Sequence, residues 1–247
     1  MTGYILVEST DGVLSLTFNR PEKKNALNRD MYLALIAALE AAGRDEGTRV
    51  LIFAGAGDNF TAGNDLADFR DGVDDIDAFP ALKFVRTLAA FEKPMIAAVR
   101  GGAIGIGATL LFHCDLVYAA PDARLWMPFI DLGLLPEAGV SLLAPHRLGM
   151  ARASQYLLLG DAFTGEEAFR CGLVNALSPA GQVLDCAQDA ARRLAAKPAQ
   201  ALRQARRLLR GDPSALLAQI DVEARLFADA LASPETQARL TAFFSRA

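Results

Sequence analysis

The chain is poor in the residues that carry most nucleophilic and metal chemistry. Its 247 residues include two histidines and three cysteines. Cys114, Cys171 and Cys186 are odd in number and unclustered, which argues against a disulfide framework and a zinc site. His113 and His146 form no HExxH motif, and no serine lies in a GxSxG motif, so zinc-protease and serine-hydrolase chemistry lack their parts. We expect reduced thiols, packed structural histidines and no metal.

Long apolar runs and excess positive charge are also missing. No apolar run reaches the roughly 18 residues that a membrane-spanning helix needs, and the N-terminus lacks the pattern of a signal peptide. The net charge is −4 and the pI about 5.3, with acidic and basic residues interspersed. Arg203, Arg206, Arg207 and Arg210 fall at helical spacing, which favours a solvated helix face over a binding patch. We expect a cytoplasmic protein that binds neither nucleic acid nor membrane.

What the chain does contain is an apolar run that stops at dense glycine. Residues 93–115 read KPMIAAVRGGAIGIGATLLFHCD, a pattern that predicts a strand, a tight turn and a helix start. Glycine permits positive φ and close approach, and the N–H groups of a helix start favour negative charge. Neither GxGxxG nor a phosphate-loop lysine is present. Two alternatives remain, an oxyanion pocket or close packing of the backbone.

A second glycine-rich segment lies in a similar setting. Residues 4–8 and 13–19 predict a hairpin, Asn28 can cap a helix that ends near Gly43, and residues 49–54 predict a buried strand. That strand runs into GAGDNFTAGNDL, residues 55–66, and a helical region from 76 to 91 leads to the first glycine stretch. Alternating strands and helices favour parallel pairing. Because ligands gather at the carboxyl ends of parallel strands, we expect both glycine segments to face one crevice.

The last third of the chain is helical in pattern. After short strands at 115–120 and 124–127, Thr164 and Glu167 form a capping box, and helices are expected over 182–196, 199–210 and 214–245. With 52% hydrophobic residues, the chain can bury a substantial core. We expect one compact unit in which residues 1–190 form the core and residues 191–247 a helical region.

Carboxylates are the remaining candidates for chemistry. Asp65 follows the glycine segment, where it can cap the next helix or contact a ligand. Asp131 and Glu137 lie in the loop after the strand at 124–127. Glu137 is flanked by apolar residues at 134–136, 138 and 140, so desolvation would raise its pKa toward the range of a general base. By spacing alone, a surface-loop glutamate is the competing interpretation.

Five blocks in order resemble the crotonase, or enoyl-CoA hydratase/isomerase, superfamily: RPEKKNALN, FTAGNDL, the glycine stretch, LGLLPEAG and GEEAFRCGLVN. The resemblance covers nearly the whole chain. It implies an α/β fold of repeated ββα units that form a spiral core, with a helical C-terminal region that drives trimers or hexamers. It also implies an acyl-CoA thioester as substrate and no cofactor.

The resemblance also assigns site residues. Carried over by motif, the N–H groups of Ala62 and Ile106 bind the thioester oxygen and stabilise its negative charge in the enolate. Phe244 and Arg246 could close the groove from the tail. The residues implied to contact the CoA or acyl group are Lys24, Ala26, Phe60, Gly63, Asp65, Leu66, Gly105, Gly107, Phe129 and Asp131.

Two departures from the family pattern shape the functional hypothesis. Common enoyl-CoA hydratases use two glutamates to activate water, and these positions here hold Thr109 and Phe129. Glu137 resembles instead the single glutamate of Δ3,Δ2-enoyl-CoA isomerases, which moves a proton from C2 to C4. We therefore expect an isomerase of fatty-acid or aromatic-acid degradation. The alternatives are atypical hydration, dienoyl isomerisation, another lyase reaction, thioester hydrolysis through Asp131, and a catalytically silent acyl-CoA-binding protein.

Overall fold

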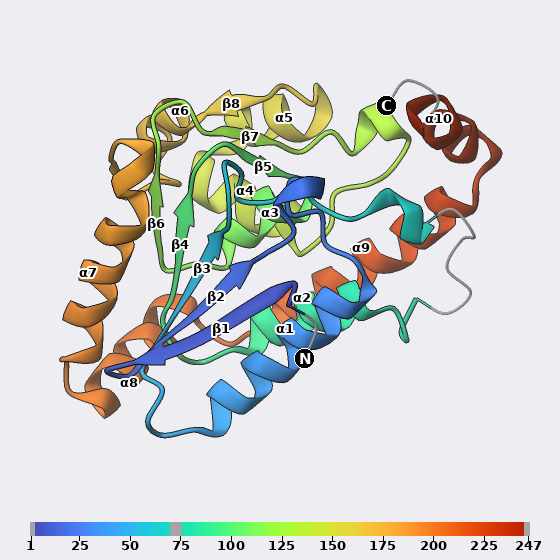
Figure 1. Ribbon diagram of the computed structural model, residues 1–247. Coiled ribbons are helices and arrows are strands. Elements are labelled where there is room, and N and C mark those ends of the chain that lie inside the picture. Colours follow the sequence, from blue (N-terminus) through green and yellow to red (C-terminus); the bar gives the residue numbers. More distant parts are fainter. Residues whose placement is uncertain (1–2, 70–75, 245–247) are drawn as a thin grey trace.

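A computed structural model describes residues 3–69 and 76–244, and within them a six-stranded sheet forms the centre of the molecule (Figure 1). The strand order is β1-β2-β3-β4-β6-β9, with β1 antiparallel to β2 and all other neighbours parallel. The strands are β1 (Ile5–Thr10), β2 (Val13–Phe18), β3 (Val50–Gly55), β4 (Met95–Val99), β6 (Leu116–Ala119) and β9 (Ala176–Leu177). The predicted hairpin and parallel pairing are confirmed, and the carboxyl ends of β2, β3 and β4 share one edge.

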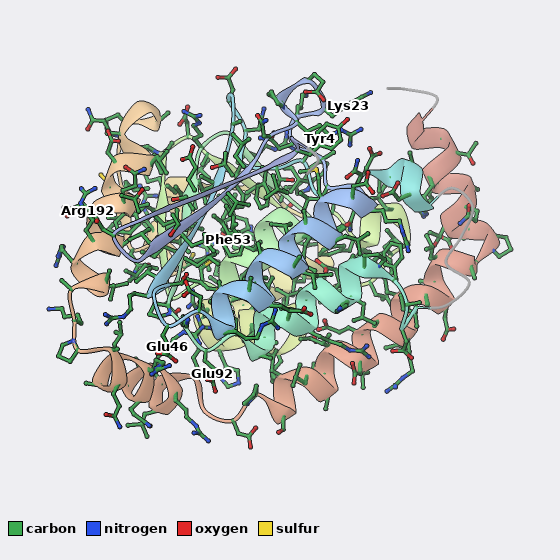
Figure 2. The ribbon with its side chains drawn as sticks, turned by 60° about the horizontal axis from the view of Figure 1, so that its bottom comes forward. Tyr4, Lys23, Glu46, Phe53, Glu92 and Arg192 are labelled. Atoms are coloured by element: carbon green, nitrogen blue, oxygen red, sulfur yellow. The ribbon has the colours of Figure 1, made fainter. Side chains whose placement is uncertain are left out.

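Helices cover this sheet because their apolar stripes face it. Asn28 accepts a hydrogen bond from the Met31 amide at 3.0 Å, so the predicted N-cap of α1 (Arg29–Arg44) is confirmed. α1 lies side by side with α2 (Pro80–Ala90), and α7 (Val183–Ala195) packs on β3, β4 and β6. Figure 2 places Phe53 of β3 in the middle of the molecule, whereas Arg192 of α7 lies at its edge.

The glycine stretch at residues 93–115 differs from the expected strand-turn-helix. Gly102–Ile104 forms β5, which pairs with β7 (Arg124–Trp126) in a small sheet that also contains β8 (Phe163–Thr164). Only one α-helical turn follows, α3 (Ile106–Thr109), before the 3₁₀ turn η3 (Leu110–Phe112). Partners on both sides hold Gly102–Ile104 extended. Such tertiary pairing overrides local spacing and leaves no trace in the local sequence.

The C-terminal third is helical, as predicted. Its helices are α4 (Val140–Leu148), α5 (Met150–Leu158), α6 (Gly165–Arg170), α7, α8 (Ala199–Arg210), α9 (Ser214–Ala232) and α10 (Pro234–Phe244). The capping box of Thr164 and Glu167 is confirmed. The single helix expected over 214–245 was wrong, because the chain turns at Ser233, where Pro234 cannot donate a backbone hydrogen bond. The expected division between a core of residues 1–190 and a helical region of residues 191–247 stays a prediction. Residue 190 lies inside α7.

The short 3₁₀ turns connect these elements, and their bounds are η1 (Pro21–Lys23), η2 (Leu66–Phe69), η4 (Ile130–Leu132) and η5 (Ala180–Gln182). No helix in the described ranges has both the length and the apolar character needed to cross a bilayer.

The arginine cluster of α8 is not the solvated face that its spacing predicts. Arg206 Nε lies 2.8 Å from Asp115 Oδ2, and Arg210 Nη2 lies 2.9 Å from Asp115 Oδ1. Arg206 also donates to the carbonyl of Phe91 at 2.6 Å. The expectation was wrong for these two side chains because the carboxylate that binds them lies 91 and 95 residues earlier in the chain. They tether α8 to the sheet.

Candidate active site

The two glycine segments meet at the carboxyl ends of β3 and β4, as predicted. We call residues 56–65 the first glycine loop and residues 100–105 the second glycine loop. The Phe60 amide donates to Arg100 at 2.8 Å, the Thr61 amide donates to Gly102 at 3.0 Å, and the Ile104 amide donates back to Thr61 at 3.0 Å. The loops are therefore joined by main-chain hydrogen bonds.

Glycine is required where these loops touch. A Cβ at Gly63, whose φ is +89°, would lie 2.7 Å from the carbonyl oxygen of Ile104, and a Cβ at Gly107 would lie 2.5 Å from Thr61 Cγ2. Close packing, one of the two alternatives, thus explains these positions. Gly105 differs, since a Cβ there would meet nothing within 4 Å.

The Asn25 side chain holds the first glycine loop by hydrogen bonds to its carbonyls. The sequence pattern did not predict this role. The side chain is fully buried. Its Nδ2 donates to the carbonyls of Ala56 and Asn59, each at 2.8 Å, and its Oδ1 accepts from the Arg20 amide at 2.9 Å. These bonds satisfy loop carbonyls that have no ladder partner. The only signal in the sequence is an asparagine in a polar turn, which suits its φ of +57°.

Several backbone amides in and beside these loops have no acceptor among the described residues. They include Ile106 N–H at the start of α3 and Asn64 N–H in the first glycine loop. The amide of Ala62, in contrast, donates to the Lys24 carbonyl at 2.9 Å. Asn64 is held by its side chain, whose Oδ1 accepts from the hydroxyl of Tyr32. Asn64 and Ile106 are therefore free to donate, whereas Ala62 is engaged.

A small apolar pocket of about 50 Å³ opens beside Asn64. Glu137 is its one carboxylate among the described residues. The pocket's other lining residues come mainly from α2 and α9, and they are Ile76, Phe79, Ala81, Leu82, Val85, Ala138, Ile220, Ala224 and Phe227. An apolar wall with a few polar groups is the usual form of a small-molecule site.

The Glu137 carboxyl sits in this apolar wall. Burial raises its pKa to about 8, the charge of Glu223 adds to the rise, and the hydrogen bond from Thr109 opposes it. Thr109 Oγ1 donates to Glu137 Oε1 at 2.6 Å. The rise has the direction that the apolar neighbours in the sequence predict. A carboxyl with a pKa near the working pH can both take and return a proton.

The turn that carries Glu137, residues 137–141, is held by side chains from other elements. Ala138 and Gly139 both have positive φ, +63° and +71°. His113 Nε2 lies 2.8 Å from the Ala138 carbonyl, and burial lowers the pKa of His113 to about 4, so a neutral ring donates from Nε2. Glu223 of α9 accepts from the Gly139 amide at 2.5 Å. Sequence spacing gave no sign of Glu223.

Most of the remaining predicted contacts lie on or near the glycine loops. Phe60 is fully buried and packs edge-on against Phe18, with ring centroids 5.2 Å apart. Lys24 is exposed, and Leu66 opens η2. Ala26 is partly buried and accepts a hydrogen bond from Arg20. A role for these residues in binding the CoA or acyl group stays a prediction.

Three predicted residues are engaged elsewhere or stand apart. Asp65 Oδ2 lies 2.6 Å from Arg20 Nη1, and its Oδ1 accepts from the Ala67 amide as a capping side chain does. Contact of Asp65 with a ligand stays a prediction. Phe129 is buried in the core at 5% exposure. Asp131 is exposed and absent from the pocket lining. Arg246 lies outside the described residues, as does the side chain of Phe244.

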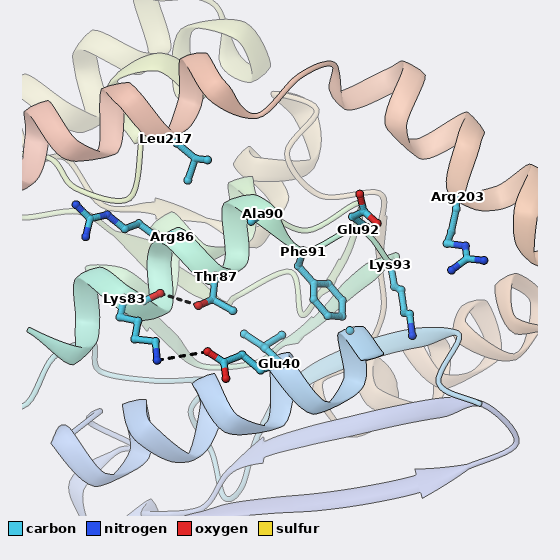
Figure 3. Close-up of a pocket in the computed structure, with 12 residues that line it drawn as sticks. Glu40, Lys83, Arg86, Thr87, Ala90, Phe91, Glu92, Lys93, Arg203 and Leu217 are labelled. Carbon is cyan, nitrogen blue, oxygen red and sulfur yellow. Dashed lines mark hydrogen bonds and ion pairs between the residues drawn. The ribbon is translucent and has the colours of Figure 1, made fainter. Parts of the chain in front are cut away.

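A larger hollow of about 580 Å³ lies elsewhere, between α1, α2, α8 and α9 (Figure 3). Charged side chains surround it, and several are paired, as in the ion pair of Lys83 with Glu40 at 3.3 Å. None of its lining residues is among those predicted to bind substrate. Size alone does not identify a candidate site here, because it is the smaller pocket that Glu137 and Asn64 line.

Comparison with known proteins agrees with this geometry. The sequence profile described as enoyl-CoA hydratase/isomerase matches residues 8–247. The chain is 41% identical over 181 residues to rat enoyl-CoA delta isomerase 2, a match that spans 71% of this chain and about half, 46%, of that protein. It is 34% identical over 248 residues to 2,3-dehydroadipyl-CoA hydratase of Escherichia coli, covering 98% of this chain and 96% of that protein. The solved structure of Pseudomonas aeruginosa OdaA superimposes with a TM-score of 0.93 at 44% identity, over 98% of this chain and 99% of that one. The chain therefore belongs to the enoyl-CoA hydratase/isomerase family and has the crotonase fold.

Proposed function

We propose that the chain is an enoyl-CoA isomerase that moves a carbon-carbon double bond from position 3 to position 2 of an acyl-CoA thioester. The observation that carries this proposal is the environment of Glu137. It is the one described carboxylate that lines the pocket, and it lies beside a free amide. The two hydratase glutamate positions hold Thr109 and Phe129, so water lacks its usual pair of carboxylates.

The proposed oxyanion donors are the amides of Asn64 and Ile106. Both are free of acceptors in the described part of the chain, whereas Ala62 would first have to release the Lys24 carbonyl. We therefore assign the first donor to Asn64 in place of Ala62. Amides fixed before the reaction stabilise an enolate oxygen more than a neutral carbonyl oxygen, and each contributes roughly 10²–10³ in rate.

The reaction needs one carboxylate and no water. The ionised Glu137 takes a proton from C2, so the C2–H bond breaks and an O–H bond forms. The electron pair spreads over the dienolate, whose oxygen accepts from the two amides. The carboxylic acid then gives its proton to C4, so that its O–H bond breaks, a C4–H bond forms, and the double bond that lay between C3 and C4 now lies between C2 and C3. Thr109 favours the ionised form between cycles, because its hydroxyl donates to Glu137.

The pocket lining also bears on the substrate. Residues from α2 and α9 present apolar side chains, which suits a hydrocarbon acyl group and not a charged one. The pocket has a volume of about 50 Å³, enough for a few water molecules. Assembly into homotrimers or hexamers and a cytoplasmic location stay predictions.

The test is turnover of 3-enoyl-CoA and 2-enoyl-CoA thioesters by wild type and Glu137→Gln. We expect wild type to convert 3-enoyl to 2-enoyl thioesters, and Glu137→Gln to lose roughly 10²–10⁴ of the rate. Formation of 3-hydroxyacyl-CoA in place of 2-enoyl-CoA would favour a hydratase. Release of free CoA would favour hydrolysis, and tight binding without turnover would favour the silent acyl-CoA-binding protein.

A further inference from the structure

We propose that Glu223 of α9 is a positioning residue that holds the Glu137 turn in place and supplies the negative charge that tunes the base. This inference rests on the proposed function. The inference extends that function, because it makes α9 part of the catalytic apparatus through Glu223, which lies 86 residues after Glu137 in the sequence.

Glu223, which lies far from α4 in the sequence, caps the N-terminus of α4 by direct hydrogen bonds. Its Oε2 accepts from the Gly139 amide at 2.5 Å, and its Oε1 accepts from the Ser141 amide at 3.0 Å and from the Ser141 hydroxyl. The α4 N-terminus has no cap from its own N-cap residue, which is Gly139. Amides at a helix start need an acceptor and favour a negative one. Glu223 supplies it, although it is only 5% exposed.

The close approach of α9 depends on glycine at position 139. A Cβ there would lie 2.4 Å from Leu216 Cδ1 and 3.2 Å from Ile220 Cγ1. Without a Cβ, α9 lies near enough for Glu223 to reach the amides. Ile220, Glu223, Ala224 and Phe227 follow helical spacing, so one face of α9 both holds the turn and lines the pocket.

Glu223 is also the charged neighbour of Glu137. The titratable or polar groups around Glu137 and its turn are Thr109 of α3, Asn64 of the first glycine loop, Tyr32 of α1, His113 at the end of η3 and Glu223 of α9. Burial raises the pKa of Tyr32 and lowers that of His113 to about 4, so both are neutral near pH 7. Neither Glu137 nor Glu223 has an ion-pair partner in the described ranges. Burial raises the pKa of Glu223, and the hydrogen bonds from Ser141 and Gly139 oppose that rise. An ionised Glu223 opposes ionisation of Glu137.

The test uses Glu223→Gln with Asp221→Asn as the matched control. Asp221 is on the same helix, but its carboxylate binds Arg86 Nε at 2.8 Å and not the Glu137 turn. An amide at 223 lacks the charge and turns an N–H₂ group toward amide donors. We expect kcat to fall about 10- to 100-fold with KM changed less than about threefold, and the Asp221→Asn control to keep both values.

A measurement on the unliganded protein tests the role of Glu223 independently of the reaction that the enzyme catalyses. The pH titration of the Glu137 carboxyl carbon is followed by ¹³C NMR in the unliganded protein, and the signal is assigned by its loss in Glu137→Gln. We expect Glu223→Gln to move its midpoint to lower pH, whatever reaction the enzyme catalyses. An unchanged midpoint, or equal effects of Glu223→Gln and Asp221→Asn on kcat, would overturn the proposal.

A milder variant covers the case in which Glu223→Gln fails to fold. Ser141→Ala removes the hydroxyl donor and leaves both backbone amides and all charges in place. We expect a two- to fivefold fall in kcat with unchanged KM, an effect of the size of about one weak hydrogen bond. A folded Ser141→Ala protein with the wild-type kcat would count against the role of Glu223 in holding the Glu137 turn.

Discussion

The two glycine loops are joined to each other by main-chain hydrogen bonds, whereas the turn that carries Glu137 is held by side chains from other elements. On the oxyanion side, by which we mean Asn64 and Ile106 with the two glycine loops, the loops hydrogen-bond to each other through backbone groups. On the base side, by which we mean residues 137–141, the contacts come from Thr109, His113 and Glu223.

The difference follows from what each side must do. An amide donor needs only a fixed backbone, and glycine lets two backbones touch. A base must also change charge during the reaction, so the groups around it must tolerate both states. Thr109 favours the ionised form and Glu223 opposes it. Side chains can supply such opposing effects at chosen distances, and a backbone ladder cannot.

The oxyanion side should be the more sensitive to an added methyl group. Gly63→Ala would place Cβ 2.7 Å from the Ile104 oxygen at a φ of +89°, so the two loops must separate. We expect kcat/KM to fall about 100-fold through misplaced amides and the free energy of unfolding to fall by about 1–3 kcal/mol. Steady-state assays and denaturant unfolding measure both.

The control for that substitution is Gly43→Ala. Gly43 lies in α1, where a Cβ would meet nothing within 4 Å. Alanine there should raise the free energy of unfolding by about 0.5–1 kcal/mol and leave turnover alone. If Gly63→Ala behaves like Gly43→Ala, close backbone contact does not place the amides.

The base side should respond to loss of a single hydroxyl. Thr109→Val keeps the shape and removes the donor to Glu137, so the pKa of Glu137 should rise further and less base is ionised at pH 7. We expect kcat/KM at pH 7 to fall about tenfold, which corresponds to about one pKa unit. The loss should shrink as the pH is raised above 8.

Thr87→Val is the matched control for this change. The Thr87 hydroxyl donates to the Lys83 carbonyl on α2 at 2.8 Å, beside the larger hollow (Figure 3). It should leave kcat/KM and its pH dependence unaltered. A Thr109→Val enzyme whose deficit is the same at every pH would show that the hydroxyl does not tune the base.

The smallest effect is expected where the base side departs from ordinary backbone geometry. Ala138 has a φ of +63°, a conformation that costs alanine about 1 kcal/mol or more and glycine little. Ala138→Gly should therefore raise the free energy of unfolding by up to about 1 kcal/mol, whereas Ala41→Gly in α1 should lower it by about as much. Turnover should stay within about threefold, because side chains hold the turn. A larger loss of turnover would show that the backbone of Ala138 positions Glu137.

The same contrast explains what the sequence could predict. Glycine density and strand patterns indicated the two loops and their meeting point, because both signals are local. The apolar neighbours of Glu137 indicated the direction of its pKa shift for the same reason. β5 was missed because its pairing partners lie outside the glycine stretch.

Contacts between residues that lie far apart in the sequence could not be predicted from the sequence. Glu223 binds Gly139 and Ser141 across 84 and 82 residues, and nothing in the helical pattern of α9 distinguishes it from a surface glutamate. The motif alone also assigned the oxyanion donor to Ala62. The Ala62 amide donates to the Lys24 carbonyl and the Asn64 amide has no acceptor among the described residues, which is why we propose Asn64 instead.

The central claim is that Glu137 is the base, and its pH profile tests this most directly. The measurement is kcat/KM for a 3-enoyl-CoA thioester from pH 5 to 10 in wild type and Glu137→Gln. A base must be ionised, and the pKa of Glu137 is raised to about 8, so the wild-type value should rise with pH and level off above about 8. Glu137→Gln should be slower by roughly 10²–10⁴ and lack that rise. A Glu137→Gln enzyme with the wild-type rate, or with the same rise near pH 8, would contradict the account.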